Sequence, residues 1–471
     1  MRVLFATAEL RPLVSTGGLG EASAGLVGAL RRLGHDVEVI LPDYAGWELE
    51  DEDDLMVRVP GWASPACARR GVHREAGRLI LVSVPGIERP HPYVDAAGIG
   101  WPDNDSRFAA FSAAVASVAE LLGPDIVQLN DWHTGLVPAL LGQSIPTVLT
   151  IHNLAHQGWA NIGWLHELPT HRDSYHHGDA LNMLAGAIRA VDAVVTVSPT
   201  YATEIVTEAG GMGLNGALEA RDQIYGIRNG IDTMTWDPAI DPHLPASFSF
   251  DAPAGKEQAK AALVDRAGWG EVKTPVVAMV TRLAEQKGVD LAFEAARYLE
   301  GMRARLMVLG SGEQRLADWG RWLTEEYPGR FWFIDGYDVP LSHLMFAGAD
   351  LFLMPSRFEP CGLAQMQAMA YGTIPVVTGV GGLGDTVMDA DASRDGNGFV
   401  SQTVDLAGVV DALHRALSAW RHAGRRRRII RHGMAVDWSW AEPAVELADL
   451  YESVMAAAAG KAFATGGAAS P

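Results

Sequence analysis

The apolar residues of this chain fall into short, nearly continuous runs, and longer segments with helical spacing separate these runs. Val3–Ala8 and Leu351–Met354 are two examples. Continuous apolar strands are typical of parallel sheets that are covered on both faces, because neither face meets water. Helices between successive strands impose right-handed crossovers, which predict an α/β protein with doubly wound, Rossmann-like sheets. The predicted strands are Val3–Ala8, Asp36–Leu41, Leu79–Val84, Ile126–Leu129, Thr147–Ile151, Ala193–Val197, Val276–Thr281, Leu306–Leu309, Phe331–Ile334, Leu351–Met354 and Ile374–Val377.

A break in this pattern divides the chain into two similar halves. Asp241–Pro245 and Asp251–Gly255 have the composition of turns and linkers. With 471 residues the chain is also too long for one ordinary core. We therefore predict a first domain over residues 1–245 and a second over residues 246–440. Glu442–Ala459 is predicted to form a closing helix, and the Gly-, Ala- and Ser-rich residues 460–471 are predicted to be a disordered tail.

Composition limits the possible functions without choosing among them. The 57 acidic and 37 basic residues leave a net charge of −20, which repels nucleic acids and anionic membranes at long range. Cys67 and Cys361 are the two cysteines, so we predict no disulfide framework, no Cys-based zinc site and a location in a reducing cytoplasm. The first nine residues have the pattern of a core strand, not of a signal peptide. No apolar stretch approaches the roughly 20 residues of a membrane span.

The segment Pro355–Leu363 is the most informative candidate site. It follows the predicted strand Leu351–Met354 and precedes a segment with a helical pattern, Ala364–Tyr371. In open α/β sheets, ligands bind at the carboxyl ends of the strands. Glu359 could hold neutral hydroxyl groups there, and the helix start beside Gly362 offers free N–H groups to an anion. This combination suits a nucleotide sugar.

Two cations follow the first strand of the second half. Arg282 and Lys287 lie in one loop after Val276–Thr281. The planar fork of an arginine and the mobile charge of a lysine together suit a pyrophosphate. The alternative is that both residues are solvated surface charges.

Polar residues also follow two strands of the first half. His152 comes directly after Thr147–Ile151, where it could contact a sugar hydroxyl or transfer a proton. The alternative is a purely structural histidine. Asp131 follows Ile126–Leu129 and precedes an aromatic residue, an arrangement that can hold a sugar. Alternatively, Asn130 or Asp131 caps the N-terminus of a helix.

Paired glycines follow a strand in each half. They are Gly17–Gly18 and Gly381–Gly382. Such pairs occur where the backbone must approach another group, such as a ligand, closely. The alternative is that the glycines only allow a tight turn. Neither loop is a G-x-G-x-x-G fingerprint, and no G-x-x-x-x-G-K-[ST] motif occurs. A dinucleotide oxidoreductase and a P-loop enzyme are therefore not expected.

Other notable residues carry weaker signals. Tyr337 could stack on a nucleobase or be a boundary aromatic that is half in the core. Asn229 begins an Asn-Gly pair, which alone indicates only a turn. Asp389 and Asp391 have no partner His or Cys in a metal-binding pattern, so no metal site is predicted. The acidic residues 51–54 are predicted to be a solvated loop, and Arg425–Arg428 a solvated helix end, not a nucleic-acid site.

Taken together, these motifs resemble bacterial glycogen synthases and plant starch synthases. The matching motifs run in order from Arg2 to about residue 455, and several are long and unusual. They are Asn130–His133, His152–Gln157, Ser198–Ala202, Asn229–Asp232, Arg282–Gly288, Arg357–Leu363 and Trp440–Tyr451. The resemblance implies the GT-B fold, in which two Rossmann-like domains face a deep cleft and the C-terminal helix, residues 441–459, crosses back to the first domain. It also implies a retaining transfer of glucose from ADP-glucose to the non-reducing end of an α-1,4-glucan such as glycogen, with no metal and no cofactor.

The resemblance implies roles for the residues at matching positions. Arg282 and Lys287 would neutralise the leaving diphosphate in place of a metal. Glu359 would hold hydroxyls of the donor glucose, and His152 would contact the transferred glucose. These four are the implied catalytic residues. The implied donor-binding residues are Ser15, Thr16, Gly17, Gly18, Tyr337, Cys361, Gly362, Leu363 and Ala364. The implied acceptor-binding residues are Asp131 and Asn229.

Several positions depart from the pattern of the family. Ser15 stands where the family usually has a lysine, and Glu21 stands where it usually has an aspartate. Ala364 occupies a position that often carries a hydrogen-bonding side chain. Three further positions where basic or aromatic side chains are frequent hold Ala185, Ala370 and Gln367.

These departures leave three hypotheses. The first is a glucosyltransferase that uses ADP-glucose and elongates a glucan. The second is the same chemistry with UDP-glucose as the donor or a small glucoside as the acceptor. The third is a glucan-binding protein in which donor binding is impaired.

Overall fold

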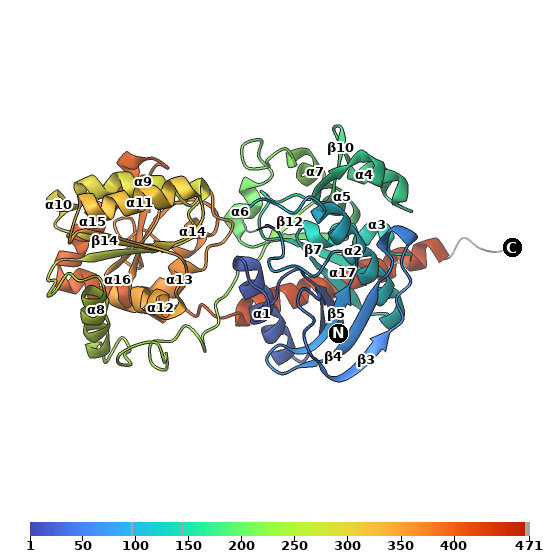
Figure 1. Ribbon diagram of the computed structural model, residues 1–471, viewed down its shortest axis with the longest axis horizontal. Helices are drawn as coiled ribbons and strands as arrows, with labels where there is room; N and C mark the ends of the chain where they lie inside the picture. Colours follow the sequence, from blue (N-terminus) through green and yellow to red (C-terminus); the bar gives the residue numbers. More distant parts are fainter. Residues whose placement is uncertain (96–97, 143–144, 467–471) are drawn as a thin grey trace. The chain divides into compact units, whose positions relative to one another are not determined.

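The computed structural model describes residues 1–95, 98–142 and 145–466, with side chains up to residue 460. Its contacts divide the chain into two compact units. Unit 1 consists of Met1–Gly230 and the C-terminal segment from Trp440 onwards, and unit 2 is Ile231–Ser439. Each unit is a layered α/β structure in which helices cover a central sheet (Figure 1).

Within the described residues, unit 1 contains a nine-stranded sheet in the order β12-β11-β7-β6-β1-β2-β5-β4-β3. Neighbouring strands from β12 to β5 are parallel, whereas β4 and β3 add an antiparallel edge. The strands are β1 (Arg2–Ala6), β2 (Asp36–Pro42), β3 (Glu50–Leu55), β4 (Cys67–His73), β5 (Gly77–Ser83), β6 (Ile126–Asn130), β7 (Thr147–Ile151), β11 (Ala193–Thr196) and β12 (Ile224–Gly226). A small antiparallel sheet adds β8 (Trp159–Asn161), β9 (His176–His177) and β10 (Ala180–Asn182).

The helices of unit 1 connect and cover these strands. They are α1 (Gly18–Arg32), α2 (Asn104–Leu122), α3 (Val137–Leu140), α4 (Arg172–Tyr175), α5 (Met183–Ala190), α6 (Pro199–Glu204), α7 (Asn215–Glu219) and α17 (Ala441–Gly466), with 3₁₀ turns η1 (Gly61–Ala63), η2 (Trp132–Thr134) and η3 (Ile162–Glu167). In α1, Glu21 in the first turn and Arg31 and Arg32 in the last turn carry the charges that the helix dipole favours at each end.

The C-terminal helix α17 packs on α1 in unit 1, which confirms the predicted return of the chain to the first domain. The hydroxyl of Tyr451 donates a hydrogen bond to Gln128 of β6 at 2.8 Å. A Cβ at Gly25 of α1 would lie 2.0 Å from the indole nitrogen of Trp440, so only glycine allows this close approach. The helix continues to Gly466, beyond the predicted end at Ala459. Of the predicted tail, residues 467–471 lie outside the described residues.

Unit 2, whose residues are all described, contains a six-stranded parallel sheet in the order β15-β14-β13-β16-β17-β18. Its strands are β13 (Val276–Val280), β14 (Arg305–Gly310), β15 (Phe331–Asp335), β16 (Leu351–Met354), β17 (Ile374–Thr378) and β18 (Phe399–Ser401). Its helices are α8 (Ala254–Arg266), α9 (Val289–Ala295), α10 (Leu299–Met302), α11 (Gln314–Glu326), α12 (Val339–Gly348), α13 (Ala364–Ala370), α14 (Gly381–Thr386), α15 (Leu406–Arg421) and α16 (Ala423–Ala435), with η4 (Glu285–Lys287) and η5 (Ala296–Tyr298).

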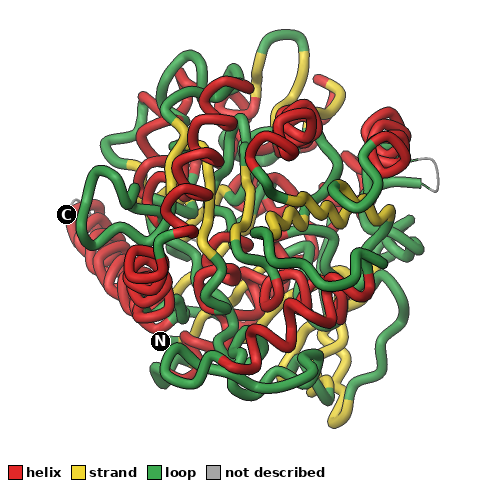
Figure 2. The backbone as a smooth tube through the Cα atoms, turned by 90° about the vertical axis from the view of Figure 1, so that its left-hand side faces the viewer, coloured by secondary structure: helices red, strands yellow, loops and turns green. Residues whose placement is uncertain are grey.

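Helices cover both faces of this sheet, as continuous apolar strands predict. Helices α9, α11 and α15 lie on one side of β14 in Figure 1, and α8, α12, α13 and α16 lie on the other. Figure 2, seen from the left-hand side of Figure 1, shows strands with helices around them. The predicted α/β class with parallel, doubly wound sheets is confirmed, and all eleven predicted strands are present.

The division between the units differs from the predicted boundary at residue 245. Residues 231–245 belong to unit 2 because their side chains are anchored there. The ring of Trp236 stacks on that of His343 with 4.1 Å between centroids. Asp241, predicted to lie in a linker, is buried and accepts a hydrogen bond from His343 Nδ1 at 2.8 Å.

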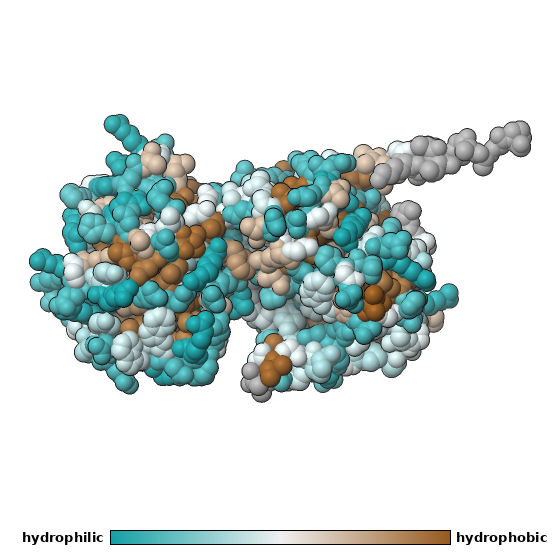
Figure 3. Space-filling model, turned by 90° about the horizontal axis from the view of Figure 1, so that it is seen from above, coloured by the Kyte–Doolittle hydropathy of each residue, from teal (hydrophilic) through white to brown (hydrophobic). Residues whose placement is uncertain are grey.

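The acidic residues 51–54 were predicted to be a solvated loop. They are exposed, as predicted, but the prediction of a loop is wrong. They form most of β3, which pairs with β4 at the antiparallel edge of the unit 1 sheet. The strand is exposed, and Glu52 forms an ion pair with Arg69 of β4 at 2.6 Å. Charged side chains are common on edge strands because they discourage pairing with other chains. Figure 3 shows that most of the visible surface is hydrophilic, in keeping with the many charged residues.

Candidate active site

The order of strands in unit 2 places its candidate residues at one edge of the sheet. The chain passes from β13 to β14 and β15 on one side, and then returns to β16 on the other side of β13. Such a switch point leaves room for a ligand at the carboxyl ends of the two central strands. The loop with Arg282 and Lys287 follows β13, and the loop with Glu359 follows β16.

Lys287 and Glu359 meet at this switch point. The ammonium of Lys287 lies 2.6 and 2.9 Å from the two carboxylate oxygens of Glu359. The side chains are 17% and 5% exposed, so the ion pair is largely shielded from water. The hydroxyl of Ser356 donates a further hydrogen bond to Glu359 at 3.1 Å. The carboxylate is thus oriented before any ligand arrives.

Two further contacts hold the loops that carry this ion pair. Gly288 has φ +63°, and a Cβ there would lie 1.9 Å from the carbonyl oxygen of Pro355, so the two loops can meet only at a glycine. Arg357 donates two hydrogen bonds to the carboxylate of Asp290, at 2.8 and 2.7 Å. The hydrogen bonds from Arg357 lower the pKa of Asp290 below its usual value. The loops after β13 and β16 are therefore tied together.

The side chain of Gln365 holds the predicted phosphate-binding turn by hydrogen bonds. Its amide nitrogen donates to the carbonyls of Cys361 and Gly362 at 3.1 and 2.9 Å, and to the hydroxyl of Thr386 at 3.1 Å. Gly362 has φ +73°, a conformation that favours glycine. The thiol of Cys361 is buried, which leaves its backbone as the part that could contact a donor. Leu363 and Ala364 are partly exposed at the start of α13.

Arg282 and Tyr337 lie on the surface of unit 2. Arg282 is exposed two residues after the end of β13. Tyr337 follows β15 and is 73% exposed, so it is not the half-buried core aromatic that was considered as an alternative. An exposed aromatic ring can stack on a flat ligand group.

In unit 1 the glycine loop is held by Glu9, which follows β1. Both oxygens of the buried Glu9 carboxylate accept hydrogen bonds from Thr16, at 2.7 Å from its backbone N–H and 2.8 Å from its hydroxyl. Tyr93 donates a third hydrogen bond to Glu9 at 2.8 Å. Gly17 and Gly18 are exposed, and a Cβ at either position would meet nothing within 4 Å. The open space beside these glycines is available to a ligand.

The two glycine pairs differ in what they approach. A Cβ at Gly381 would lie 2.0 Å from the carbonyl oxygen of Glu359, and one at Gly382 would lie 2.3 Å from that of Cys361. The second pair is therefore required by packing against the chain itself. No such packing requirement applies to Gly17 or Gly18.

Asp131 and His152 are joined at the carboxyl ends of β6 and β7. The buried carboxylate of Asp131 accepts a hydrogen bond from the backbone N–H of His152 at 2.7 Å. Its side chain makes no capping hydrogen bond to the following 3₁₀ turn, so the capping alternative does not describe Asp131. The imidazole Nε2 of His152 lies 2.9 Å from Oδ1 of Asn130. Strand β6, which precedes Asp131, neighbours β1 at the switch point of the unit 1 sheet.

Burial determines the charge state of both groups. It raises the pKa of Asp131 to about 7, although hydrogen bonds from the backbone of His152 and Asn153 oppose this shift. It lowers the pKa of His152 to about 4, so the imidazole is neutral near pH 7. A neutral imidazole beside a carboxyl group that titrates near neutrality can take part in hydrogen bonding or proton transfer.

The other residues of unit 1 that the sequence singled out belong to other segments of the chain. Asn229 is buried in the segment after β12, and strands β11 and β7 lie between β12 and β6. Ser15 is exposed, and its hydroxyl donates to the carbonyl of Gly17 at 3.1 Å. Ala185 is fully buried in α5. Glu21 forms an ion pair with Arg11 at 2.6 Å.

Comparison with known proteins agrees with this arrangement. Residues 2–220 match the family model described as starch synthase catalytic domain, and residues 264–434 match the model described as glycosyl transferases group 1. The chain is 41% identical to a glycogen synthase from Halorhodospira halophila over 97% of its own length and 99% of that protein. It is 40% identical to a glycogen synthase from Thioalkalivibrio sulfidiphilus, over 97% and 100% of the two chains.

A solved structure extends the similarity to the fold. The catalytic domain of starch synthase IV from Arabidopsis thaliana, bound to ADP and acarbose, matches with a TM-score of 0.87 and 32% identity, over 97% of this chain and 99% of that one. The chain belongs to the glycogen synthase and starch synthase family. Its fold is therefore GT-B, and the protein is a glycosyltransferase. The predicted family, fold class and enzyme class are confirmed.

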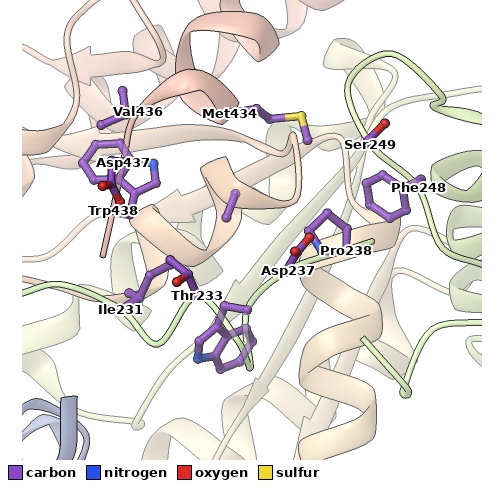
Figure 4. A pocket seen from close by; sticks show the side chains of 12 residues that line it. Ile231, Thr233, Asp237, Pro238, Phe248, Ser249, Met434, Val436, Asp437 and Trp438 are labelled. Carbon is purple, nitrogen blue, oxygen red and sulfur yellow. The ribbon is translucent and has the colours of Figure 1, made fainter. Parts of the chain in front are cut away.

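A cavity of about 220 Å³ lies in unit 2 of this glycogen synthase homologue, and Figure 4 shows side chains that line it. None of the predicted site residues lines it. The lining residues are Ile231, Thr233, Trp236, Asp237, Pro238, Phe248, Ser249, Ala370, Met434, Val436, Asp437 and Trp438. Its volume is below the roughly 300 Å³ of common small-molecule sites. Ala370, one of the departures from the family pattern, thus faces this cavity.

The structure also accounts for other charged groups that the sequence singled out. Asp389 and Asp391 form ion pairs with Arg415, both at 2.9 Å, and Arg425 also pairs with Asp391. Among the described residues, no group of three or more His, Cys, Asp or Glu side chains could hold a metal ion. No helix within this described part is long and apolar enough to cross a membrane.

Several residues that position the site were missed in the sequence. Glu9 interrupts the apolar start of the chain, and a carboxylate just after a buried strand could have indicated its role. Tyr93 and Asp290 carry no such local signal, because their partners Glu9 and Arg357 are far away in the sequence. Gln365 bonds to Cys361 and Gly362, which are close in sequence, but a glutamine at this spacing has no distinctive pattern.

Proposed function

We propose that this member of the glycogen synthase family transfers glucose from ADP-glucose to the non-reducing end of an α-1,4-glucan, with retention of the anomeric configuration and without a metal. The observation that carries the proposal is the shielded pair of Lys287 and Glu359 at the switch point of unit 2, beside the Gly362 turn. A cation, a carboxylate and the backbone N–H groups at the start of α13 together suit the phosphate and the sugar of one donor.

The proposed roles follow from the position of each group. Lys287 and Arg282 stabilise the leaving diphosphate, as fixed charges do for a developing anion. Glu359 accepts hydrogen bonds from hydroxyls of the donor glucose. The backbone of residues 361–364 contacts phosphate, and Tyr337 stacks on the base. The known complex of starch synthase IV with ADP and acarbose supports a nucleotide and an oligosaccharide as ligands.

Unit 1 supplies the groups for the sugar and the acceptor. His152 contacts the transferred glucose, while Asp131 and Asn229 bind the acceptor. Residues 15–18 contact the donor diphosphate through the loop that Glu9 holds. The two free cysteines, Cys67 and Cys361, support a cytoplasmic location because neither is used in a disulfide.

The test compares nucleotide release from ADP-glucose and UDP-glucose, with and without glycogen. We expect ADP release that depends on glycogen, and labelled glucose in the product that β-amylase removes, because that enzyme attacks α-1,4 bonds from non-reducing ends. Faster release from UDP-glucose, or equal turnover on a simple glucoside, would favour the second hypothesis. Glycogen binding without nucleotide release from either donor would identify a glucan-binding protein and overturn the proposal.

A further inference from the structure

Asn130 connects three parallel strands at the carboxyl edge of the unit 1 sheet. It is the last residue of β6 and is fully buried. Its amide nitrogen donates to the carbonyl of Ala6, the last residue of β1, at 2.9 Å. Its amide oxygen lies 2.9 Å from Nε2 of His152, which directly follows β7. The amide therefore has one defined partner on each side.

These two partners fix the orientation of the amide. A backbone carbonyl can only accept a hydrogen bond, so the NH₂ group of Asn130 must face Ala6. Rotating the amide by half a turn would place two oxygens 2.9 Å apart with no proton between them. The oxygen of Asn130 therefore faces His152, and because an amide oxygen only accepts, Nε2 of His152 must carry a proton.

The hydrogen-bonding role of the other ring nitrogen, Nδ1, follows from this proton position. In a neutral imidazole with its proton on Nε2, Nδ1 has a free lone pair and can only accept a hydrogen bond. Within the described part of the chain, the structure gives no hydrogen-bond partner to Nδ1 of His152, whereas the backbone N–H of the same residue is held by Asp131. The ring is thus oriented by its neighbours on one edge and available on the other.

We propose that Asn130 is a positioning residue that holds His152 in the Nε2–H tautomer, so that Nδ1 accepts a hydrogen bond from a hydroxyl of the transferred sugar. This inference rests on the proposed function for the identity of the sugar. It excludes His152 as a proton donor to the leaving group, because its only ring proton is engaged by Asn130. It also requires that the contacted group of the sugar carry a hydrogen.

Nitrogen NMR of the whole enzyme labelled with ¹⁵N-histidine tests the tautomer directly. The chain has 15 histidines, so the signals of His152 are assigned by their loss in His152→Gln. We expect a pyrrole-type shift for Nε2 and a pyridine-type shift for Nδ1 in the free enzyme near pH 7. The opposite pattern, or a charged imidazolium at this pH, would overturn the proposal whether or not the enzyme uses ADP-glucose.

Two variants and one control separate positioning from general stability. Asn130→Leu removes both hydrogen bonds of the amide, and we expect a mixture of tautomers and about a tenfold loss of kcat/KM. Asn130→Asp places a carboxylate beside Nε2, so the pKa of His152 should rise by about 1 to 3 units. Thr134→Val removes a different buried hydrogen bond to Asn130, the one that its hydroxyl accepts from the backbone N–H at 3.0 Å. This control should leave the tautomer unchanged.

Kinetics of a double variant provide a second test. If Asn130 acts through His152, then Asn130→Leu combined with His152→Gln should lose no more kcat/KM than His152→Gln alone. Additive losses would show that Asn130 acts independently of the imidazole and would overturn the proposal. An unchanged tautomer in a folded Asn130→Leu variant would do the same.

Discussion

Replacing Lys287 with methionine is the most direct perturbation of the proposed diphosphate site. Methionine keeps a long, unbranched side chain but removes the ammonium that lies 2.6 and 2.9 Å from the oxygens of Glu359. If this ammonium also stabilises the leaving diphosphate, kcat/KM for the donor should fall by roughly 10² to 10³. Arg282→Met should cost less, about tenfold, because Arg282 is exposed and water screens its charge.

The size of the effect follows from the shielding of each cation. At an effective dielectric constant of about 20, unit charges about 3 Å apart attract by about 5.5 kcal/mol, against about 1.4 kcal/mol in bulk water. Because the side chain of Lys287 is only 17% exposed, its interaction energy lies nearer the value for the lower dielectric constant. Desolvation of the ammonium and its attraction to Glu359 reduce the net stabilisation of the leaving diphosphate to about 3 to 4 kcal/mol. Losing this stabilisation corresponds to the predicted fall in kcat/KM of roughly 10² to 10³.

The assay is ADP release at saturating glycogen with ADP-glucose varied, and thermal unfolding verifies that each variant is folded. Lys287→Arg keeps the charge and should recover part of the activity. Arg315→Met is the control, because it removes a cation that forms exposed ion pairs with Glu313 and Glu285. Turnover near wild type in a folded Lys287→Met variant, or a larger loss in Arg282→Met, would refute the reasoning.

Three further changes test neighbouring parts of the site. Ser15→Lys should lower the KM for ADP-glucose by adding a cation to the glycine loop, and an unchanged KM would place Ser15 outside the donor site. Because burial raises the pKa of Asp131 to about 7, the folded protein binds a proton that the unfolded chain releases near pH 4. The stability that this proton supplies is complete below about pH 4 and is lost as the pH rises through about 7, by up to about 4 kcal/mol. Asp131→Asn should therefore show a smaller fall in Tm between about pH 5 and about pH 8 than the wild type, and equal falls would contradict the assignment. Arg357→Leu breaks the paired hydrogen bonds to Asp290 and should lower kcat about tenfold by loosening the loop of Glu359, whereas Arg266→Leu, at an exposed ion pair, should leave kcat unchanged.

The buried strands were predictable because their environment is uniform. A parallel strand covered on both faces leaves a continuous apolar run, and all eleven such runs became strands. The strands that were missed have no such environment. Strand β3 is exposed and acidic, and its edge position comes from pairing with β4, a contact that no local pattern encodes. Strands β12 and β18 have three residues each, which is too short for a periodic signal.

For the candidate site, the sequence predicted which residues lie at strand ends but not which side chains they contact. Lys287, Glu359, Asp131 and His152 were found because each follows a strand, and strand ends meet at one edge of a parallel sheet. The contacts between them depend on which strands are neighbours. Lys287 meets Glu359 because β16 returns beside β13, and Thr16 meets Tyr93 at Glu9 because their loops converge after β1.

The two glycine pairs show most clearly why such contacts cannot be predicted from the sequence. Both pairs open a helix after a strand, and both have the letters Gly-Gly-Leu-Gly. At Gly381 the missing side chain makes room for the carbonyl of Glu359, so the glycine helps to position the loop that carries Glu359. At Gly17 the space is empty, so the backbone remains open to a ligand. The two pairs therefore require glycine for different reasons. At Gly381 the glycine leaves room for an atom of the chain itself, whereas at Gly17 it leaves room for an atom of the proposed donor.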